Sequence, residues 1–155
     1  MKVKILYLAF LLLLLAGCDE IVKDEEVPQI NMSGPNDFPQ NCATVYRGEA
    51  FVFSATLTDN MELGSYSIEM HHNFDHHTHS TSGTSCEMDA IKLPVDPFLF
   101  IEEYEIPAGL TSFTVQNQIV VPANVDTGDY HITIRLTDKS GWQTFKGIAV
   151  KVAER

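Results

Sequence analysis

Five of the six histidines of the chain lie within nine residues, and this density of imidazole groups points to metal chemistry. The group consists of His71, His72, His76, His77 and His79, with Asp75 among them. Imidazole is the commonest protein ligand for zinc, copper and nickel, and with an unperturbed pKa of about 6.5 it is mostly neutral at pH 7. Asp75 adds either a ligand oxygen or an acceptor that orients one ring. The segment predicts a transition-metal site, with zinc as the first candidate and copper or nickel next.

Strand geometry divides these side chains into two sets. If the segment stays extended, the face directed to solvent carries His71, Asp75, His77 and His79. His72 and His76 then belong to the opposite face. The extended set spans more than roughly 20 Å, whereas zinc holds nitrogen at about 2.0–2.1 Å, so a single ion requires the segment to curl. The spacing follows no fixed metal motif, which leaves a solvated polar loop or a pH-responsive patch as alternatives.

Cys42 and Cys86 are the two thiols that follow Cys18. An oxidising envelope or extracellular compartment allows such cysteines to pair, and a disulfide between them would close a loop of about 45 residues and contribute up to about 4 kcal/mol. It also fixes the far end of the histidine segment. The alternative is that Cys86 is a thiolate ligand beside the histidines, joined by Met70 or Met88 for copper(I).

The beginning of the chain has the features of an export segment with a lipid attachment site. Lys2 and Lys4 precede an apolar run at 5–17, which is shorter than the roughly 20 residues that cross a bilayer as a helix. The sequence Leu-Ala-Gly-Cys at 15–18 resembles the lipobox of bacterial lipoproteins. This resemblance implies removal of residues 1–17 and a membrane anchor on Cys18. The expected location is the bacterial outer membrane, either surface-exposed or periplasmic.

Composition limits the remainder to one acidic domain. The chain has 155 residues, 45% of them hydrophobic, and a formal net charge of −11. Residues 18–28 are acidic without apolar periodicity, which predicts a flexible tether, and residues 29–155 are long enough for a single domain. Because nucleic-acid binding depends on cationic side chains that displace counterions, the charge excludes nucleic acid as a partner.

The hydrophobic pattern of the domain has a period of two, which predicts an all-β fold. About seven strands are expected, at 29–32, 48–59, 65–74, 98–106, 112–121, 129–138 and 142–152. This number, with turn residues between the strands, is typical of an immunoglobulin-like β-sandwich. In the segment 129–138, alternation directs Tyr130 inward and His131 outward. Tyr130 is expected to bury its ring and to bond its hydroxyl to nearby backbone.

Two further groups of side chains have structural interpretations. Asp96 with Glu102, Glu103 and Glu105 offers carboxylates for calcium, but no EF-hand loop is present, and a solvated strand face is favoured. Trp142 is expected to cap one end of the sandwich.

Several of these features together resemble a family of small Bacteroidota lipoproteins that is known only as a domain of unknown function. They are the lipobox, the acidic stretch, the histidine segment, Cys86, the Pro-Val-Asp-Pro of 94–97 and the segment 128–142. The resemblance covers nearly the whole chain. It implies one immunoglobulin-like domain on a lipid anchor and no established activity.

The sequence therefore favours a membrane-anchored cell-envelope lipoprotein that binds zinc, or else copper or nickel, for storage, sensing or delivery to an envelope transporter. The alternative is a non-catalytic adhesion or assembly module that contacts a surface protein and has no metal role. An enzyme is not expected, because the chain contains no G-x-S-x-G elbow, no glycine-rich phosphate loop and no H-E-x-x-H.

Overall fold

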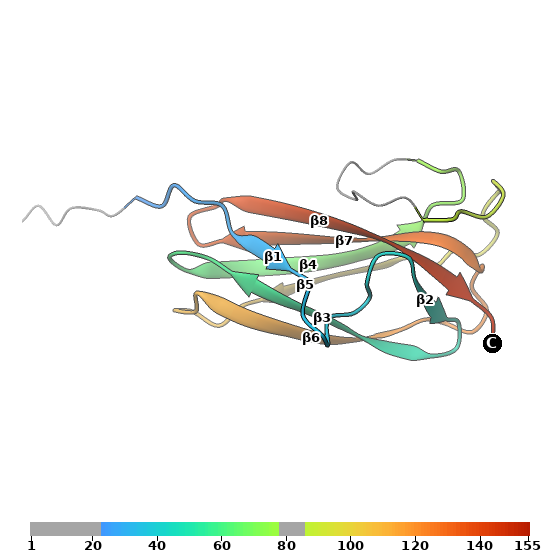
Figure 1. The fold of residues 1–155 in the computed structure, drawn as a ribbon, viewed down its shortest axis with the longest axis horizontal. Helices are drawn as coiled ribbons and strands as arrows, with labels where there is room; N and C mark the ends of the chain where they lie inside the picture. The colour runs from blue at the N-terminus through green and yellow to red at the C-terminus, as the bar shows by residue number, and fades with distance from the viewer. Residues whose placement is uncertain (1–22, 78–85) are drawn as a thin grey trace, which may run out of the picture.

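The computed structural model describes residues 23–77 and 86–155, which form two packed β-sheets (Figure 1). The strands are β1 (Gln29–Asn31), β2 (Ala43–Tyr46), β3 (Ala50–Thr58), β4 (Leu63–His72), β5 (Phe100–Glu105), β6 (Ser112–Val120), β7 (Gly128–Asp138) and β8 (Gln143–Ala153). One sheet has the order β1-β3-β6 and the other the order β2-β8-β7-β4-β5. Within the described ranges, no helix is long and apolar enough to cross a membrane.

The strand order is that of an immunoglobulin-like sandwich. The chain changes sheets before and after β2, between β3 and β4, between β5 and β6, and between β6 and β7. Paired strands are antiparallel, except for β2, which runs parallel to the edge of β8. These crossings place the two sheets face to face, as in two-sheet Greek-key domains. The predicted all-β immunoglobulin-like sandwich is confirmed.

Alternation of apolar and polar residues builds the core between the sheets. The fully buried side chains on the facing strands include Phe53, Leu57, Ile68, Met70, Val115, Ile119, Ile132, Ile134 and Leu136. Each belongs to the inward set that a period of two predicts for its strand. The opposite face of β7 carries half-buried polar residues, among them His131. The same alternation that makes the core therefore sets which side chains reach solvent.

The main difference from the predicted strands is β2, an additional strand of four residues. Only Val45 of this strand is buried, so the segment has no alternating pattern long enough to recognise. It forms because Cys42 and Ala43 lie beside the edge of β8, where the N–H of Cys42 donates to the carbonyl of Ala149 at 2.8 Å.

Tyr130 links β7 to two neighbouring loops. Its ring is fully buried, and its hydroxyl donates to the carbonyl of Asp126 at 2.7 Å and accepts from the N–H of Phe98 at 3.1 Å. Burial raises the pKa of Tyr130, so the hydroxyl keeps its proton as a donor. The ring and hydroxyl positions expected for this residue are confirmed.

Replacement of Tyr130 by phenylalanine should lower the free energy of unfolding by about 1–3 kcal/mol, because it leaves the buried partners of the hydroxyl without a hydrogen bond. Urea denaturation measures this change. Tyr46→Phe is the control, since the Tyr46 hydroxyl makes no hydrogen bond to the described residues, and it should shift stability by less than about 0.5 kcal/mol. Equal effects of the two substitutions would contradict the role of Tyr130.

The described end of the acidic stretch lies against the sandwich. The indole N–H of Trp142 donates to the carbonyl of Asp24 at 3.2 Å, and the hydroxyl of Thr144 donates to the carbonyl of Pro28. Asp24 itself is 93% buried, since only 7% of its surface is exposed. Residues 23–28 are therefore docked on the sandwich, whereas the sequence predicted a flexible tether throughout 18–28. Side-chain hydrogen bonds from Trp142 and Thr144 to the backbone of this segment oppose the mutual repulsion of its acidic side chains.

Candidate metal centre

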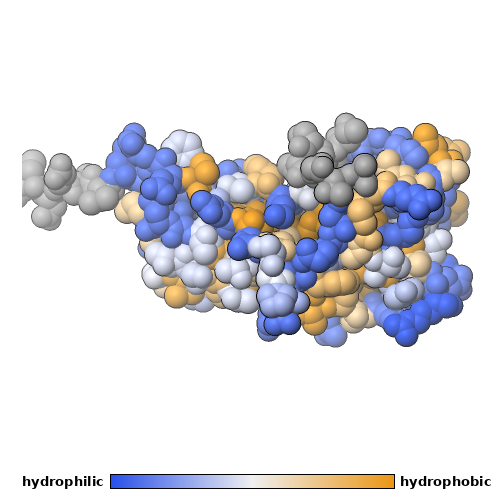
Figure 2. Space-filling view, viewed as in Figure 1, coloured by the Kyte–Doolittle hydropathy of each residue, from blue (hydrophilic) through white to orange (hydrophobic). Residues whose placement is uncertain are grey.

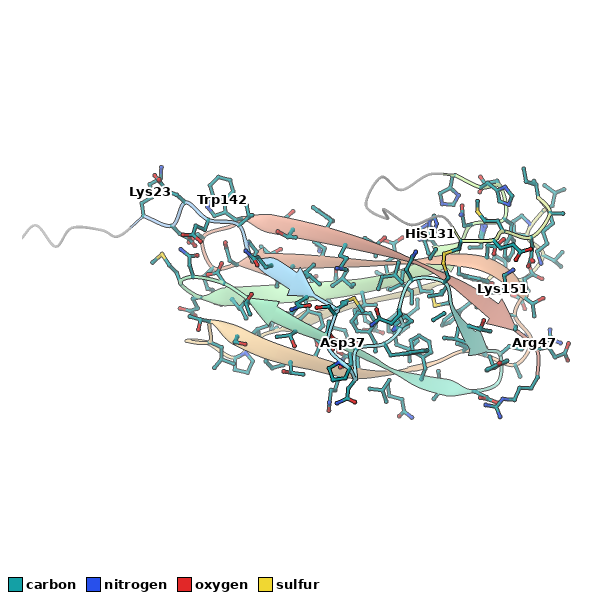
Figure 3. All side chains as sticks on the ribbon, in the orientation of Figure 1. Lys23, Asp37, Arg47, His131, Trp142 and Lys151 are labelled. Carbon is teal, nitrogen blue, oxygen red and sulfur yellow. A yellow bond between two sulfur atoms is a disulfide. The ribbon has the colours of Figure 1, made fainter. Side chains whose placement is uncertain are left out.

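Three histidines meet at the end of the sandwich opposite Lys23 and Trp142 (Figure 3). His71 lies near the end of β4, and the β4–β7 ladder places His131 directly across from it. His77 follows on the loop that leaves β4. One ring nitrogen from each of these residues lies within 4.8 Å of those of the other two. We call this group the histidine triad.

The rings of the histidine triad are arranged around a small shared space. His71 and His77 are stacked, with their centroids 5.4 Å apart and their planes at 14°. The ring of His131 stands edge-on to both, at centroid distances of 6.1 Å from His71 and 5.6 Å from His77. The Nε2 atoms of His71 and His77 are 3.2 Å apart. The nitrogens of the stacked pair therefore point toward each other.

Carboxylates lie at the outer nitrogens of the stacked pair. His77 Nδ1 lies 2.5 Å from Asp75 Oδ1 and donates to it, and His71 Nδ1 lies 3.1 Å from Glu69 Oε1. The hydrogen bond with His77 lowers the pKa of Asp75. A carboxylate beside Nδ1 favours a proton on that nitrogen, which leaves Nε2 as the lone-pair donor. This carboxylate–histidine arrangement is the one that orients imidazole ligands in metal sites.

The facing Nε2 atoms are suited to share a cation. At 3.2 Å one Nε2 can donate to the other when it carries a proton, but if both carry lone pairs, as their carboxylate partners favour, they repel each other unless a positive charge lies between them. Two nitrogens that bind one tetrahedral zinc, each at about 2.0–2.1 Å, lie about 3.3 Å apart. The spacing of the stacked pair fits this geometry. His131 is placed to contribute a third nitrogen.

Asn73 holds His131 in position. Its side chain is buried, and Nδ2 lies 3.1 Å from Nε2 of His131. The backbone N–H of Asn73 donates to the carbonyl of Asp129 at 2.7 Å, which extends the contact between the end of β4 and the start of β7. An amide nitrogen only donates, so this contact uses the Nε2 lone pair of His131. Ligation by His131 through Nδ1 therefore requires the amide of Asn73 to turn Oδ1 toward an Nε2–H group.

Of the side chains predicted as ligands, the structure brings His71 and His77 together and places Asp75 behind His77. His72 lies on the opposite face of β4, where its ring is 4.9 Å from that of Phe74. His76 directs Nε2 to the carbonyl of Asp89 at 2.9 Å. Neither joins the triad, because alternation along β4 and the turn that follows it direct their rings elsewhere. His79 lies outside the described residues.

His131 and Asn73 are members of the site that sequence reasoning missed. His131 was correctly predicted to face outward from its strand, yet nothing local to residue 131 connects it with residue 71. The connection comes from the pairing of β4 with β7, which are joined by hydrogen bonds across about 60 residues of chain. The proximity of His131 to His71 could have been predicted from the expectation that these two strands are neighbours in a Greek-key sandwich.

Cys42 and Cys86 form a disulfide with their Cα atoms 5.4 Å apart. The sulfur of Cys86 is therefore not a thiolate ligand, and Met70 is fully buried in the core. These placements remove the thiolate and Met70 from the copper(I) alternative, whereas Met88 is exposed and its sulfur lies 3.8 Å from Nδ2 of Asn73. Beyond Cys86, the backbone N–H of Asp89 donates to Asp129 Oδ2 at 2.7 Å, so the chain returns to β7 close to the triad.

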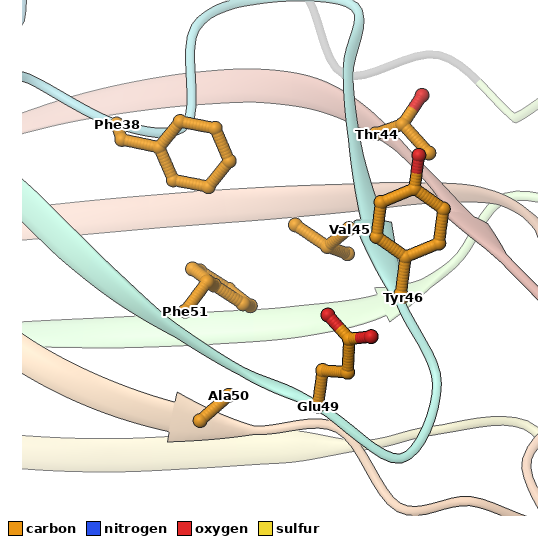
Figure 4. Close-up of a pocket in the computed structure, with 7 residues that line it drawn as sticks. All are labelled: Phe38, Thr44, Val45, Tyr46, Glu49, Ala50 and Phe51. Atoms are coloured by element: carbon orange, nitrogen blue, oxygen red, sulfur yellow. The ribbon is translucent and has the colours of Figure 1, made fainter. Parts of the chain in front are cut away.

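Other candidate sites have structural explanations. Glu102 and Glu105 are exposed on β5, and Glu103 pairs with Arg135 at 3.3 Å, as expected for a solvated strand face. An open depression of about 130 Å³ is lined by Phe38, Thr44, Val45, Tyr46, Glu49, Ala50 and Phe51 (Figure 4). Its single carboxylate, on Glu49, pairs with Arg155 at 2.7 Å. This depression therefore offers no set of metal ligands.

Comparisons with known proteins identify a family and a similar structure. A family model with the description "Domain of unknown function (DUF4625)" matches residues 16–153. No curated protein matches the chain. A solved structure described as "GspB Siglec domain" is similar, with 23% sequence identity and a TM-score of 0.46. The similarity covers 85% of this chain, which spans 60% of the length of the other.

Proposed function

The chain belongs to the DUF4625 family of domains of unknown function, and we propose that it is a zinc-binding lipoprotein of the bacterial cell envelope. In this proposal His71, His77 and His131 hold the ion, and copper(II) and nickel are the next candidates. The observation that carries the proposal is the 3.2 Å distance between two Nε2 atoms whose rings have carboxylates at their other nitrogens. That combination supports a shared cation.

The number and exposure of the ligands favour storage, sensing or delivery of the ion. Three protein ligands leave one tetrahedral position for water or for a group from a partner, whereas structural zinc sites are closed by four protein ligands. The side chains of His71 and His77 are 19% and 34% exposed. An ion at this site is therefore accessible to exchange. Delivery to an envelope transporter is one use of such exchange, and the proposal assigns no catalytic activity.

The position of the triad is compatible with attachment through a lipid on Cys18, as the resemblance to small Bacteroidota lipoproteins implies. Lys23, the first described residue, lies at the end of the sandwich that also carries Trp142 (Figure 3). His131 lies toward the other end. If the anchor holds the first end at the bacterial outer membrane, on either its surface or its periplasmic side, the triad faces away from the lipid. A partner protein then reaches it without approaching the membrane.

Titration of the metal-free chain with zinc tests the proposal. Isothermal calorimetry should show one zinc ion per chain with a dissociation constant below about 10 µM. Separate titrations with copper(II) and nickel rank the affinities of the chain for the three metals. Magnesium serves as the control, because imidazole is a poor ligand for it. Zinc binding weaker than about 100 µM would contradict the proposal and favour the alternative below.

A second candidate function is an adhesion or assembly module without a metal role. The observation that favours it is the exposure of Ile91, Leu93 and Val95, at 66%, 87% and 88%. Hydrophobic residues reach the surface at the triad end of the molecule (Figure 2). Exposed apolar side chains that gather at one place occur at protein contact sites. A chain that binds a surface protein equally well with and without zinc would support this alternative.

A further inference from the structure

A second cluster of possible ligands, formed by three aspartates, lies at the end of the sandwich that carries Lys23 and Trp142. Asp24 belongs to the docked N-terminal segment, Asp59 follows β3, and Asp138 ends β7. One carboxylate oxygen from each lies within 4.8 Å of those of the other two. Residues from three distant parts of the chain are thus brought to one point, which we call the aspartate cluster.

Two aspartates of the cluster are buried and Asp59 is half-buried, and each holds one buried oxygen without a hydrogen bond. Asp24 and Asp138 expose only 7% and 4% of their surface. Within the cluster, the buried oxygens that have no hydrogen-bond partner are Asp24 Oδ2, Asp59 Oδ1 and Asp138 Oδ2. Buried polar atoms in folded proteins nearly always have a partner, so three in one cluster require an explanation.

The other oxygens of these carboxylates are already used by the local turns. Asp59 Oδ2 accepts the backbone N–H groups of Met61 and Glu62, both at 2.8 Å. Asp24 Oδ1 accepts from the N–H of Glu26 at 3.1 Å, and Asp138 Oδ1 accepts from the N–H of Trp142 at 2.8 Å. The turns therefore account for one oxygen of each residue, and the second oxygen of each has no hydrogen bond from the described residues.

The charge of the cluster is also uncompensated within the described residues. None of the ion pairs between described side chains involves Asp24, Asp59 or Asp138. The N–H of Glu26 holds the pKa of Asp24 below its usual value, with help from the nearby side chains of Asn60 and Ser140, although burial opposes this. Buried carboxylates without a counter-charge destabilise a fold, so a positive charge is expected here.

We infer that Asp24, Asp59 and Asp138 bind a calcium ion that fastens the N-terminal segment to the end of the sandwich. Calcium takes oxygen ligands at about 2.3–2.6 Å, so two oxygens on one ion are at most about 5.2 Å apart, and the cluster satisfies this limit. Ligands that are all carboxylate oxygens favour a hard cation over zinc or copper. Three carboxylates, with water completing the coordination, suit the affinity of extracellular modules, about 10⁻⁴–10⁻³ M.

The calcium site is independent of the proposed zinc site, because its ligands differ in chemistry and lie at the opposite end of the molecule (Figure 3). It is complete only when the segment that contains Asp24 is docked. Bound calcium therefore stabilises the docked position of residues 23–28 by mass action. The orientation of the sandwich relative to its N-terminal segment then depends on the calcium concentration around the protein.

Trp142 provides a built-in reporter for a test, because it is the single tryptophan of the chain and its indole N–H contacts Asp24. The full-length chain, purified in detergent and freed of metal with EDTA, is exchanged into chelator-free buffer and titrated with calcium chloride. We expect a saturable change in tryptophan emission with a midpoint of about 0.1–1 mM and a higher melting temperature. No change in emission up to about 10 mM calcium, or an equal response to magnesium, would overturn the inference.

Two matched substitutions show whether the aspartates are the ligands. Asp59→Asn and Asp138→Asn keep one oxygen to accept the turn N–H groups and replace the second oxygen with an amide nitrogen. Each substitution should therefore lower the affinity for calcium at least about tenfold. Asp126→Asn is the control, because Asp126 Oδ2 accepts two N–H groups outside the cluster, from Val95 and Asp96. It should leave the calcium midpoint unchanged.

The stability of the same variants in EDTA separates loss of the ligand from loss of the fold. Without calcium, Asp59→Asn and Asp138→Asn remove a buried like charge, so their melting temperatures should equal or exceed that of the unsubstituted chain. A lower melting temperature in EDTA, or a calcium midpoint that matches the unsubstituted chain, would overturn the inference. Zinc titration of these variants should give the affinity of the unsubstituted chain, so failure here is distinct from failure of the zinc proposal.

Discussion

Replacement of His77 by alanine should lower the affinity of the chain for zinc by at least about 100-fold, because it removes one of three ligands. The Nε2 atom of His77 lies 3.2 Å from that of His71, and Asp75 holds the ring in this orientation. No other described histidine is placed to substitute for it, since His76 is directed to the carbonyl of Asp89. Calorimetric titration of both proteins with zinc measures the difference.

His72→Ala is the matched control for this prediction. His72 belongs to the same histidine-rich segment but lies on the other face of β4, against Phe74. Its removal should change the zinc affinity by less than about threefold, a difference of under about 0.7 kcal/mol. If His72→Ala and His77→Ala lower the zinc affinity equally, the ion is bound by any of the many imidazoles of the segment and not by the specific geometry of the triad.

His131→Ala shows whether the zinc site is made only from the histidine-rich segment or also includes a ligand from β7. A site made only from the histidine-rich segment would keep its affinity without His131. The triad predicts a loss at least as large as that for His77→Ala, since His131 faces both of the other rings. Circular dichroism of this variant should be unchanged, because His131 is on the outward, half-buried face of β7 and not in the core.

The sandwich could be predicted from the sequence where alternation was strong, and not where a strand depended on its neighbour. Tyr130, Ile132 and Ile134 alternate with polar residues over the whole of β7, and the predicted inward set is the buried set. β2 has one buried residue, Val45, and exists because it lies beside β8. Alternation of apolar and polar residues in the sequence predicts which face of a strand is buried. The pairing of a short edge strand instead depends on the tertiary structure around it.

The same distinction explains the two clusters of ligands. The sequence shows that His71 and His77 are near each other, because they are close along the chain and share a predicted face. It does not show His131 beside them, because that contact depends on the register between β4 and β7. Asp24 and Asp138 are separated even further, and their meeting depends on the docking of a segment that was predicted to be a tether. Contacts between distant segments require the fold.

Loss of the disulfide should have the largest effect on stability. The double substitution of Cys42 and Cys86 by serine should lower the free energy of unfolding by about 4 kcal/mol in the loop-entropy model, because the bond spans 44 residues. The strands β2, β3 and β4 all lie inside this loop, so the crosslink restricts the unfolded chain over a large part of the sandwich. Urea denaturation, monitored by Trp142 fluorescence, measures the change.

Reduction of the unsubstituted chain provides the control for the disulfide variant. Denaturation in the presence of dithiothreitol should give the same loss of stability as the double substitution, whereas the variant itself should not respond to the reductant. Equal stability of the oxidised and reduced chains would show that the bond adds nothing to the fold. Zinc affinity should fall less than about tenfold in the variant, because the β4–β7 ladder holds His71 and His131, and Asp75 holds His77. A loss as large as that for His77→Ala would instead place the disulfide among the groups that position the triad.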